Sequence, residues 1–228
     1  KSKALFEPRI NRCIIKSNPH VDRVLKLAST RSVFIAGNVP RSSEFESAQT
    51  SANSDFQIHL KDFIRRLTRE LINSGFCISS CPQVECVGQV AAQEVVKLET
   101  ETNPKDSAQF RIGGIFPIDR DAREMELSEV AKGKWRDFLM KFRESYLADQ
   151  EWLIVIGGNE GTADEYTAAN RLSEVKIFAV PCFGGFGEQI FKTKPNNKYR
   201  GICSDCGSTF GGCDNERFGK IINMIKGN

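Results

Sequence analysis

Five short apolar runs, each followed by glycine or a polar turn, constrain the fold of this chain more than any other feature. Their hydrophobic residues are mostly consecutive rather than alternating, which is typical of strands buried on both faces of a parallel sheet. The predicted strands are Ser32–Gly37, Phe76–Cys81, Phe110–Phe116, Glu151–Gly158 and Lys176–Gly185. Such strands need helices to cover both of their faces.

Between and after these runs lie segments whose apolar residues recur every three or four positions, which is the spacing of amphipathic helices. The predicted helices are Phe56–Ser74, Val87–Leu98, Trp135–Leu147, Asp164–Ser173 and Phe218–Ile225. Trp135 and Phe138 fall on one apolar stripe, so we expect them in the core. Alternating strands and helices predict an α/β fold with a doubly wound, mostly parallel sheet and helices on both faces.

The composition is that of a globular protein, with 40% hydrophobic and 27% charged residues among 228. A net charge of +3 is too small to indicate a nucleic-acid partner. No apolar run reaches the roughly 18 to 20 residues of a membrane span, and the first residues lack the apolar core of a signal peptide. We expect a cytoplasmic protein in which residues 1–31 form a lead-in segment or linker and residues 32–228 form one domain. Because the chain opens on Lys1, we also expect that it is processed or belongs to a longer protein.

The chain has eight cysteines without the spacing of a secreted scaffold, which favours reduced thiols. Cys203, Cys206 and Cys213 form a cluster that is open to two interpretations, a zinc site or a flexible Gly/Ser/Cys loop. Zinc needs a further ligand, and both histidines lie far away in the sequence, so we predict no metal and no cofactor.

Glycine-rich or polar segments follow four of the predicted strands: "GNVPR", "SSCPQVECVG", "GGNEGT" and "CFGGFG". The carboxyl ends of parallel strands meet at one edge of a sheet, where α/β proteins bind ligands. Glycine lets backbone N–H groups approach a phosphate, and a following helix N-terminus favours negative charge. Any one of these glycines can simply form a tight turn, but four at the same edge favour a phosphate or pyrophosphate site.

The "GGNEGT" turn also carries the acids Glu160, Asp164 and Glu165. A carboxylate there can accept hydrogen bonds from ribose hydroxyls or stabilise an oxocarbenium ion at a ribosyl carbon. The alternative is that these acids interact with the helix dipole. Thr162 likewise has an alternative role as an N-cap, and Ser79 and Ser80 can cap the helix that follows them.

The segment "GNEGTADE" (Gly158–Glu165) resembles the G-G-x-G-T-x-x-E motif of the Lonely Guy cytokinin-activating phosphoribohydrolases, with Asn159 at the second glycine. That family places an arginine on the preceding helix, and Arg143 lies about the right distance upstream. On an amphipathic helix, Arg143 can equally be a solvated charge.

Residues Ser32 to Gly187 also resemble the wider SLOG superfamily, especially the sirtuin- and TIR-associated branch that forms the sensory halves of Thoeris-type antiviral effectors. "SVFIAGNVP" is similar to that branch's first strand and loop, "WRDFLMKFRESYL" to its Trp-then-Tyr-Arg-Glu helix, and "FAVPCFGG" to a late strand. Ser80 and Cys81 stand where the family usually has a glycine-rich turn, which puts close pyrophosphate contact there in doubt.

The resemblance implies a Rossmann-like, SLOG-like domain that binds a nucleotide-derived signal, such as a cyclic ADP-ribose isomer, and regulates an antiviral effector domain in the same full-length chain. It also implies a homo-oligomer, and from the net charge and the apolar runs we expect neither nucleic acid nor a membrane as partner. In the alternative implied by the Lonely Guy motif, Glu165 and Arg143 are catalytic residues of an N-ribosyl hydrolase. A plain protein-interaction module is a third possibility. The expected ligand-binding residues are Gly37, Asn38, Arg41, Ser79, Ser80, Arg143, Gly158, Asn159, Gly161, Thr162, Glu165, Gly184 and Gly185.

Overall fold

The computed structural model describes residues 31–38, 50–81, 86–101, 110–112, 129–193 and 215–227. The chain divides into two units, Lys1–Thr30 and Arg31–Asn228, and every described residue belongs to the second. The side chain of Arg31 donates hydrogen bonds to both carboxylate oxygens of Glu151, at 2.7 and 2.8 Å. None of the described helices combines the length and the apolar character needed to cross a membrane.

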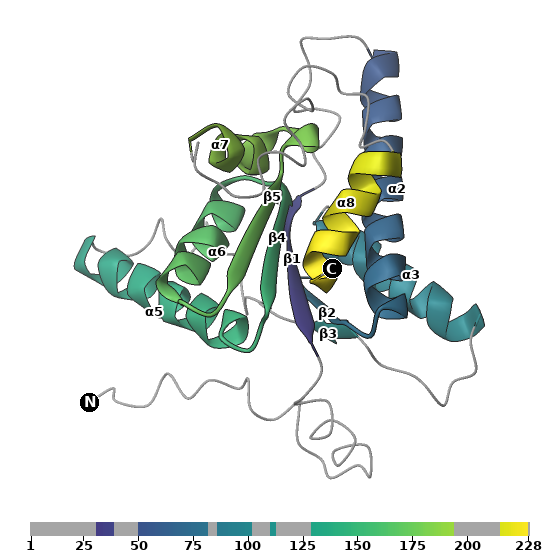
Figure 1. The fold of residues 1–228 in the computed structure, drawn as a ribbon. Coiled ribbons are helices and arrows are strands. Elements are labelled where there is room, and N and C mark those ends of the chain that lie inside the picture. Colours follow the sequence, from purple (N-terminus) through teal and green to yellow (C-terminus); the bar gives the residue numbers. More distant parts are fainter. Residues whose placement is uncertain are drawn as a thin grey trace. The chain divides into compact units, whose positions relative to one another are not determined.

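The described residues form one five-stranded sheet whose strands are all parallel, in the order β3-β2-β1-β4-β5 (Figure 1). The strands are β1 (Ser32–Asn38), β2 (Cys77–Ser80), β3 (Phe110–Ile112), β4 (Trp152–Gly157) and β5 (Lys176–Val180). Each strand is connected to the next strand in the chain by a segment that contains a helix, as the alternating sequence pattern predicts. The expected doubly wound α/β fold is confirmed.

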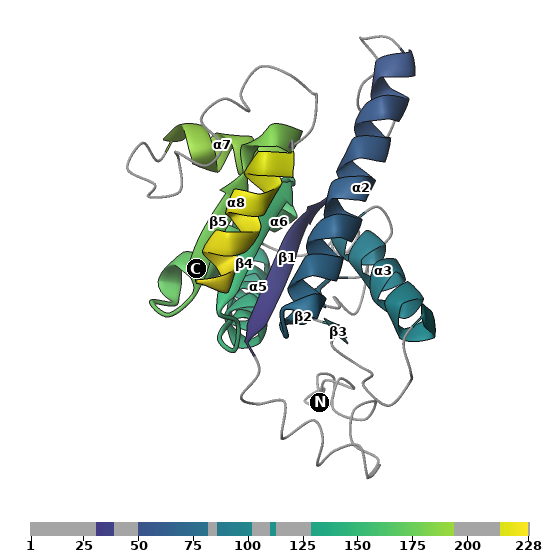
Figure 2. The same cartoon turned by 45° about the vertical axis from the view of Figure 1, so that its right-hand side comes forward.

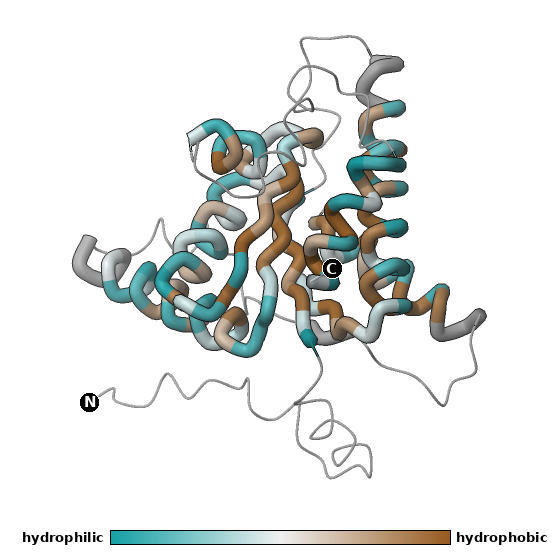
Figure 3. Tube along the Cα trace, viewed as in Figure 1, coloured by the Kyte–Doolittle hydropathy of each residue, from teal (hydrophilic) through white to brown (hydrophobic). Residues whose placement is uncertain are grey.

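Helices cover both faces of the sheet, as the two views in Figures 1 and 2 show. One face is covered by α2 (Thr50–Asn73), α3 (Val87–Glu101) and α8 (Asn215–Lys226). The other is covered by α5 (Glu129–Leu147) and α6 (Glu160–Arg171), while α7 (Gly185–Thr193) packs against β4, β5 and α6. The strands lie between these layers as a hydrophobic centre (Figure 3).

Successive residues of β1 divide between two hydrophobic cores, because side chains alternate across a strand. Val33 and Ile35 join the core beneath α2, α3 and α8. Phe34 and Ala36 join the core beneath α5 and α6. The β1 strand therefore lies between two buried layers, which explains why its sequence is continuously apolar.

Several predicted boundaries are corrected by the structure. The helix after β4 begins at Glu160 rather than Asp164, and β5 ends at Val180 rather than Gly185. After Val180 the chain forms a short 3-10 helix, η5 (Pro181–Phe183), and then α7. We did not predict α7, because the apolar run continues to Phe183 and glycines occupy the first turn of the helix.

The expectation that Trp135 and Phe138 lie in the core is wrong. The side chain of Phe138 is 45% exposed, and Trp135 is half-buried. Leu139 and Leu147 bury the apolar face of α5 instead.

Candidate functional site

The parallel strands bring the predicted turns to one edge of the sheet. The amide Oδ1 of Asn38, at the end of β1, accepts a hydrogen bond of 3.0 Å from the backbone N–H of Gly158, after β4. The carbonyl of Gly158 accepts another of 3.0 Å from the backbone N–H of Phe186, in the first turn of α7. The end of β1, the turn after β4 and the start of α7 are therefore joined at this edge. Arg41, which we expected to bind ligand here, lies outside the described residues.

The conformation of Gly158 is required by the protein's own packing. Its φ is +97°, and a Cβ there would lie 2.6 Å from the side chain of Thr162. A Cβ on Gly185 would lie 2.7 Å from the carbonyl oxygen of Gly158. At Gly158 and Gly185, packing within the protein is enough to explain why the residue is glycine, so these two glycines do not require a ligand. Gly184 differs, since a Cβ there would meet nothing within 4 Å.

Polar residues at the same edge also have structural roles. Asn159 is the N-cap of α6, and its Oδ1 accepts a hydrogen bond of 3.3 Å from the backbone N–H of Gly161. Thr162 is therefore not the N-cap and is buried in the first turn.

The two serines of β2 differ in their surroundings. The hydroxyl of Ser80 donates to the carbonyl of Ile35 at 2.6 Å, so it joins two strands and does not cap the helix that follows. Ser79 lies beside Phe34 in the neighbouring strand, which places it on the sheet face that α5 and α6 cover. Its hydroxyl is buried and has no hydrogen-bond partner among the described residues.

Arg143 is a buried cation rather than a solvated one. Its side chain is 2% exposed, and its Nη2 lies 2.9 Å from Oδ2 of Asp164, which is 41% exposed. A buried guanidinium is costly unless an acid pairs with it. The ion pair joins α5 to α6 below the edge where the turns meet.

Glu165, on α6, is a buried acid near Arg143. It contacts α5, the helix that carries Arg143. The hydroxyl of Tyr146 on α5 donates a hydrogen bond of 3.1 Å to Oε1 of Glu165. The ring of Tyr146 stacks on Phe34, with 5.1 Å between the ring centroids. Arg143 and Glu165, which we predicted as a pair, are therefore brought together around Tyr146.

Burial first, and then the nearby Cys81, raise the pKa of Glu165 to about 8, against the lowering effects of Arg143 and of the Tyr146 hydrogen bond. Glu165 is therefore mostly a neutral acid at pH 7. Burial and then the charge of Glu165 raise the pKa of Tyr146, so its hydroxyl stays protonated and remains a donor.

Sequence reasoning missed three members of this cluster as site residues: Tyr146, Asp164 as the partner of Arg143, and Cys81. Tyr146 follows Arg143 by three positions, so helical spacing places both on one face of α5. Cys81 follows Ser79 by two positions, which places it on the same side of the β2 segment. These two spacings are the features of the sequence that could have identified Tyr146 and Cys81 as site residues.

No group of three or more His, Cys, Asp or Glu side chains within the described ranges is arranged to hold a metal ion. Cys203, Cys206 and Cys213 lie outside those ranges, so the two interpretations of that cluster stay open.

Comparisons with known proteins add little beyond the fold. A scan against protein-family models found no match, and a search of curated proteins found none either. Among solved structures, the chain is similar to the X-ray structure of TM1055, a target of the Northeast Structural Genomics Consortium. The two share 16% sequence identity and a TM-score of 0.43, and the match covers 82% of this chain and 88% of that chain.

Proposed function

We propose that this domain binds a nucleotide-derived small molecule at the carboxyl edge of the sheet and acts as a sensor. The observation that carries the proposal is the partly buried hydrogen bond from Tyr146 to the buried Glu165, beside the buried Arg143. The strand order reverses between the neighbours β1 and β4: β2 and β3 follow on the side of β1, and β5 follows on the side of β4. Ligands of doubly wound sheets bind in the crevice at such a point.

The Tyr146–Glu165 pair suits a ligand hydroxyl. A neutral carboxylic acid has one O–H donor and further acceptor capacity, and Oε1 of Glu165 already accepts from Tyr146. A ribose hydroxyl both donates and accepts, so it can bond to the remaining oxygen of Glu165. This pairing supports a ribose-containing ligand.

Arg143 suits a phosphate of the same ligand. Its guanidinium already binds the carboxylate of Asp164, whose side chain is 41% exposed. A phosphate can accept a bidentate pair of charge-assisted hydrogen bonds from arginine, so it can compete with a carboxylate for the guanidinium. We propose that an incoming phosphate competes with Asp164, which weakens the ion pair that joins α5 to α6.

This exchange would couple ligand binding to the packing of the two helices, which is what a sensor requires. Together with the resemblance to the SLOG superfamily, it supports a cyclic ADP-ribose isomer or a related ADP-ribose compound as the signal. On the same basis we propose that the domain forms a homo-oligomer and regulates an attached antiviral effector.

The same site is less suited to an N-ribosyl hydrolase. Stabilising an oxocarbenium ion requires a carboxylate, whereas burial keeps Glu165 mostly protonated at pH 7. Sensing is therefore the function that the chemistry of these residues supports best.

Replacing Arg143 with methionine should weaken the binding of ADP-ribose by roughly 10- to 150-fold, because charge-assisted hydrogen bonds to the phosphate are lost. The increase in Tm that ADP-ribose produces should shrink accordingly when it is measured at a ligand concentration near the wild-type Kd. Arg136→Met is the matched control, since Arg136 is exposed on the same helix.

The control variant should keep the full increase in Tm. Equal increases for the Arg143→Met, Arg136→Met and wild-type proteins would contradict the role of Arg143. Glu165→Gln provides a second test of the site if Arg143→Met does not fold, because glutamine keeps the size and neutrality of the protonated acid. It should weaken ADP-ribose binding, because its amide NH2 can donate to the ribose hydroxyl but cannot accept a hydrogen bond from it.

A further inference from the structure

Four aromatic rings form a continuous row along α5, which we call the α5 aromatic ladder: Trp135, Phe138, Phe142 and Tyr146. The centroids of Trp135 and Phe138 are 5.5 Å apart, with their planes 21° from parallel. Those of Phe138 and Phe142 are 6.4 Å apart, with planes 13° from parallel. Phe142 then meets Tyr146 edge-on at 5.6 Å. Three rings of the ladder thus present nearly parallel planes.

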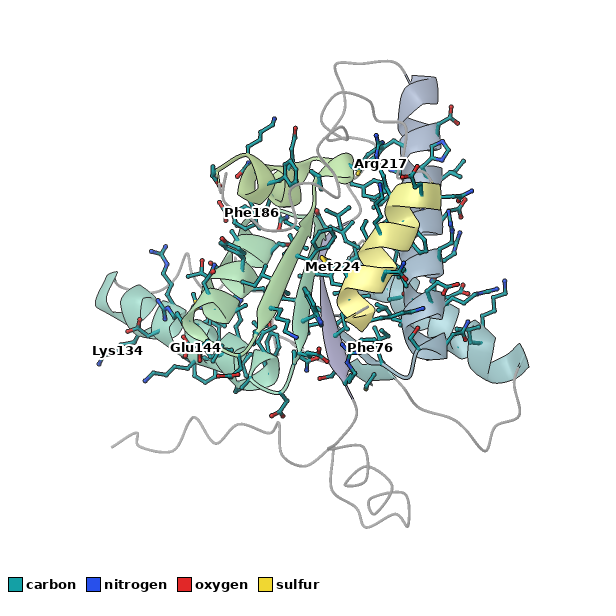
Figure 4. The ribbon with its side chains drawn as sticks, viewed as in Figure 1. Phe76, Lys134, Glu144, Phe186, Arg217 and Met224 are labelled. Atoms are coloured by element: carbon teal, nitrogen blue, oxygen red, sulfur yellow. The ribbon has the colours of Figure 1, made fainter. Side chains whose placement is uncertain are left out.

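Phe138 is the exposed ring of the ladder, and the other three rings are half-buried. Phe138 is 45% exposed, although large aromatic side chains are usually buried when a core is available. Lys134 and Lys141, on either side of Phe138 in the sequence, are also exposed. Figure 4 shows Lys134 on the part of α5 that projects away from the sheet, and Glu144, further along the helix, beside α6. Phe138 therefore offers an exposed ring that continues a row of partly buried ones.

The inner end of the ladder belongs to the site already described. Tyr146 is both the last ring of the ladder and the donor to Glu165. A ligand whose ribose bonds to Glu165 therefore lies beside the inner rings. The ladder continues outward from that position toward Phe138.

We propose that the α5 aromatic ladder is the base-binding subsite of this domain, with the planar nucleobase of the ligand stacked on the exposed ring of Phe138. The proposal rests on the proposed function, because the ribose and phosphate contacts set the direction in which the ligand extends. Nearly parallel rings favour a flat aromatic partner. The flanking lysines favour an anionic one, and a nucleotide combines both properties, whereas an apolar peptide matches only the rings.

Replacing Phe138 with alanine should weaken the binding of ADP-ribose by about 5- to 150-fold, which is the effect expected when one stacked base loses its aromatic partner. The binding of ribose 5-phosphate, which has no base, should be unchanged. Both affinities can be measured by calorimetric titration of the whole chain. Ile58→Ala is the matched control, because it removes another exposed apolar side chain, 55% exposed, from α2.

Trp135 gives a second readout that a purely structural role for Phe138 would not affect. Stacking of a base on the ladder should quench the fluorescence of Trp135 when ADP-ribose is added, and ribose 5-phosphate should not quench it. Trp135→Phe should abolish the change, because the other tryptophan, Trp152, is buried in β4.

The outcomes separate the two proposals. If ADP-ribose binds wild-type protein but Phe138→Ala binds it equally well and no quenching occurs, the base-binding subsite is refuted and the proposed function stands. If ADP-ribose and ribose 5-phosphate lose affinity equally in Phe138→Ala, the ladder supports the fold of the site and the subsite is again refuted. If neither ligand binds the folded wild-type protein, the proposed function itself fails, and the subsite fails with it.

Discussion

Replacing Glu165 with glutamine should remove most of the pH dependence of stability between about pH 4.5 and pH 8. The folded protein holds the proton of Glu165 up to about pH 8, whereas an unfolded chain releases it near pH 4.5. The contribution of this group is therefore fully present below pH 4.5 and is lost as the pH rises through 8. The free energy of unfolding should fall by up to about 1.4 kcal/mol per pH unit across that range.

Urea denaturation at a series of pH values measures this effect as the difference between wild-type protein and Glu165→Gln. Glutamine does not titrate, so the difference isolates Glu165 from the other groups that titrate in this range. Asp137→Asn is the matched control, because it makes the same acid-to-amide change at an exposed position on α5. Parallel wild-type and Glu165→Gln curves from pH 4.5 to pH 8 would show that Glu165 is not buried as a neutral acid.

Replacing Gly37 with alanine should lower the free energy of unfolding by about 3 to 5 kcal/mol, combining backbone strain with overpacking. Gly37 lies near the end of the central strand, β1, with a φ of +142°. Residues that carry a side chain rarely adopt this backbone angle. A Cβ there would lie 1.9 Å from the carbonyl oxygen of Ile156, so the backbone of β1 or β4 must move.

Gly219→Ala is the matched control for this prediction, because Gly219 lies within α8 and a Cβ there would meet nothing within 4 Å. Alanine should stabilise that helix by roughly 0.5 to 1 kcal/mol. Urea denaturation of both variants measures the two effects. A Gly37→Ala protein as stable as wild type would mean that β1 and β4 do not approach each other as the structure describes.

The sheet could be predicted from the sequence because burial on both faces leaves a direct signal. All six residues of β4 are buried, and they read as an unbroken run ending in glycine. The helix α2 was equally clear, since Leu60, Leu67 and Leu71 recur at helical spacing and are all fully buried. In both cases one local pattern is sufficient to determine the element.

The site could be predicted only in part, because its chemistry depends on contacts between elements. The sequence paired Arg143 with Glu165 through a motif, but whether Arg143 is solvated or buried depends on how α5 packs against α6. At Phe138 the prediction was wrong, because this residue lies on the apolar stripe of α5 and is nevertheless exposed. The cap at Asn159 was missed because a strand-to-helix turn can begin the helix at any of several polar residues.

Calorimetric titration of the whole chain with ADP-ribose and cyclic ADP-ribose isomers, followed by a mass measurement of the recovered ligand, tests the central claim most directly. We expect one of these ligands to bind wild-type protein, to be recovered intact, and to bind Glu165→Gln more weakly. Recovery of a cleaved ligand would instead establish an N-ribosyl hydrolase. The absence of binding to folded protein would contradict a nucleotide site at Arg143, Tyr146 and Glu165, and would leave that cluster a structural role in joining α5 to α6.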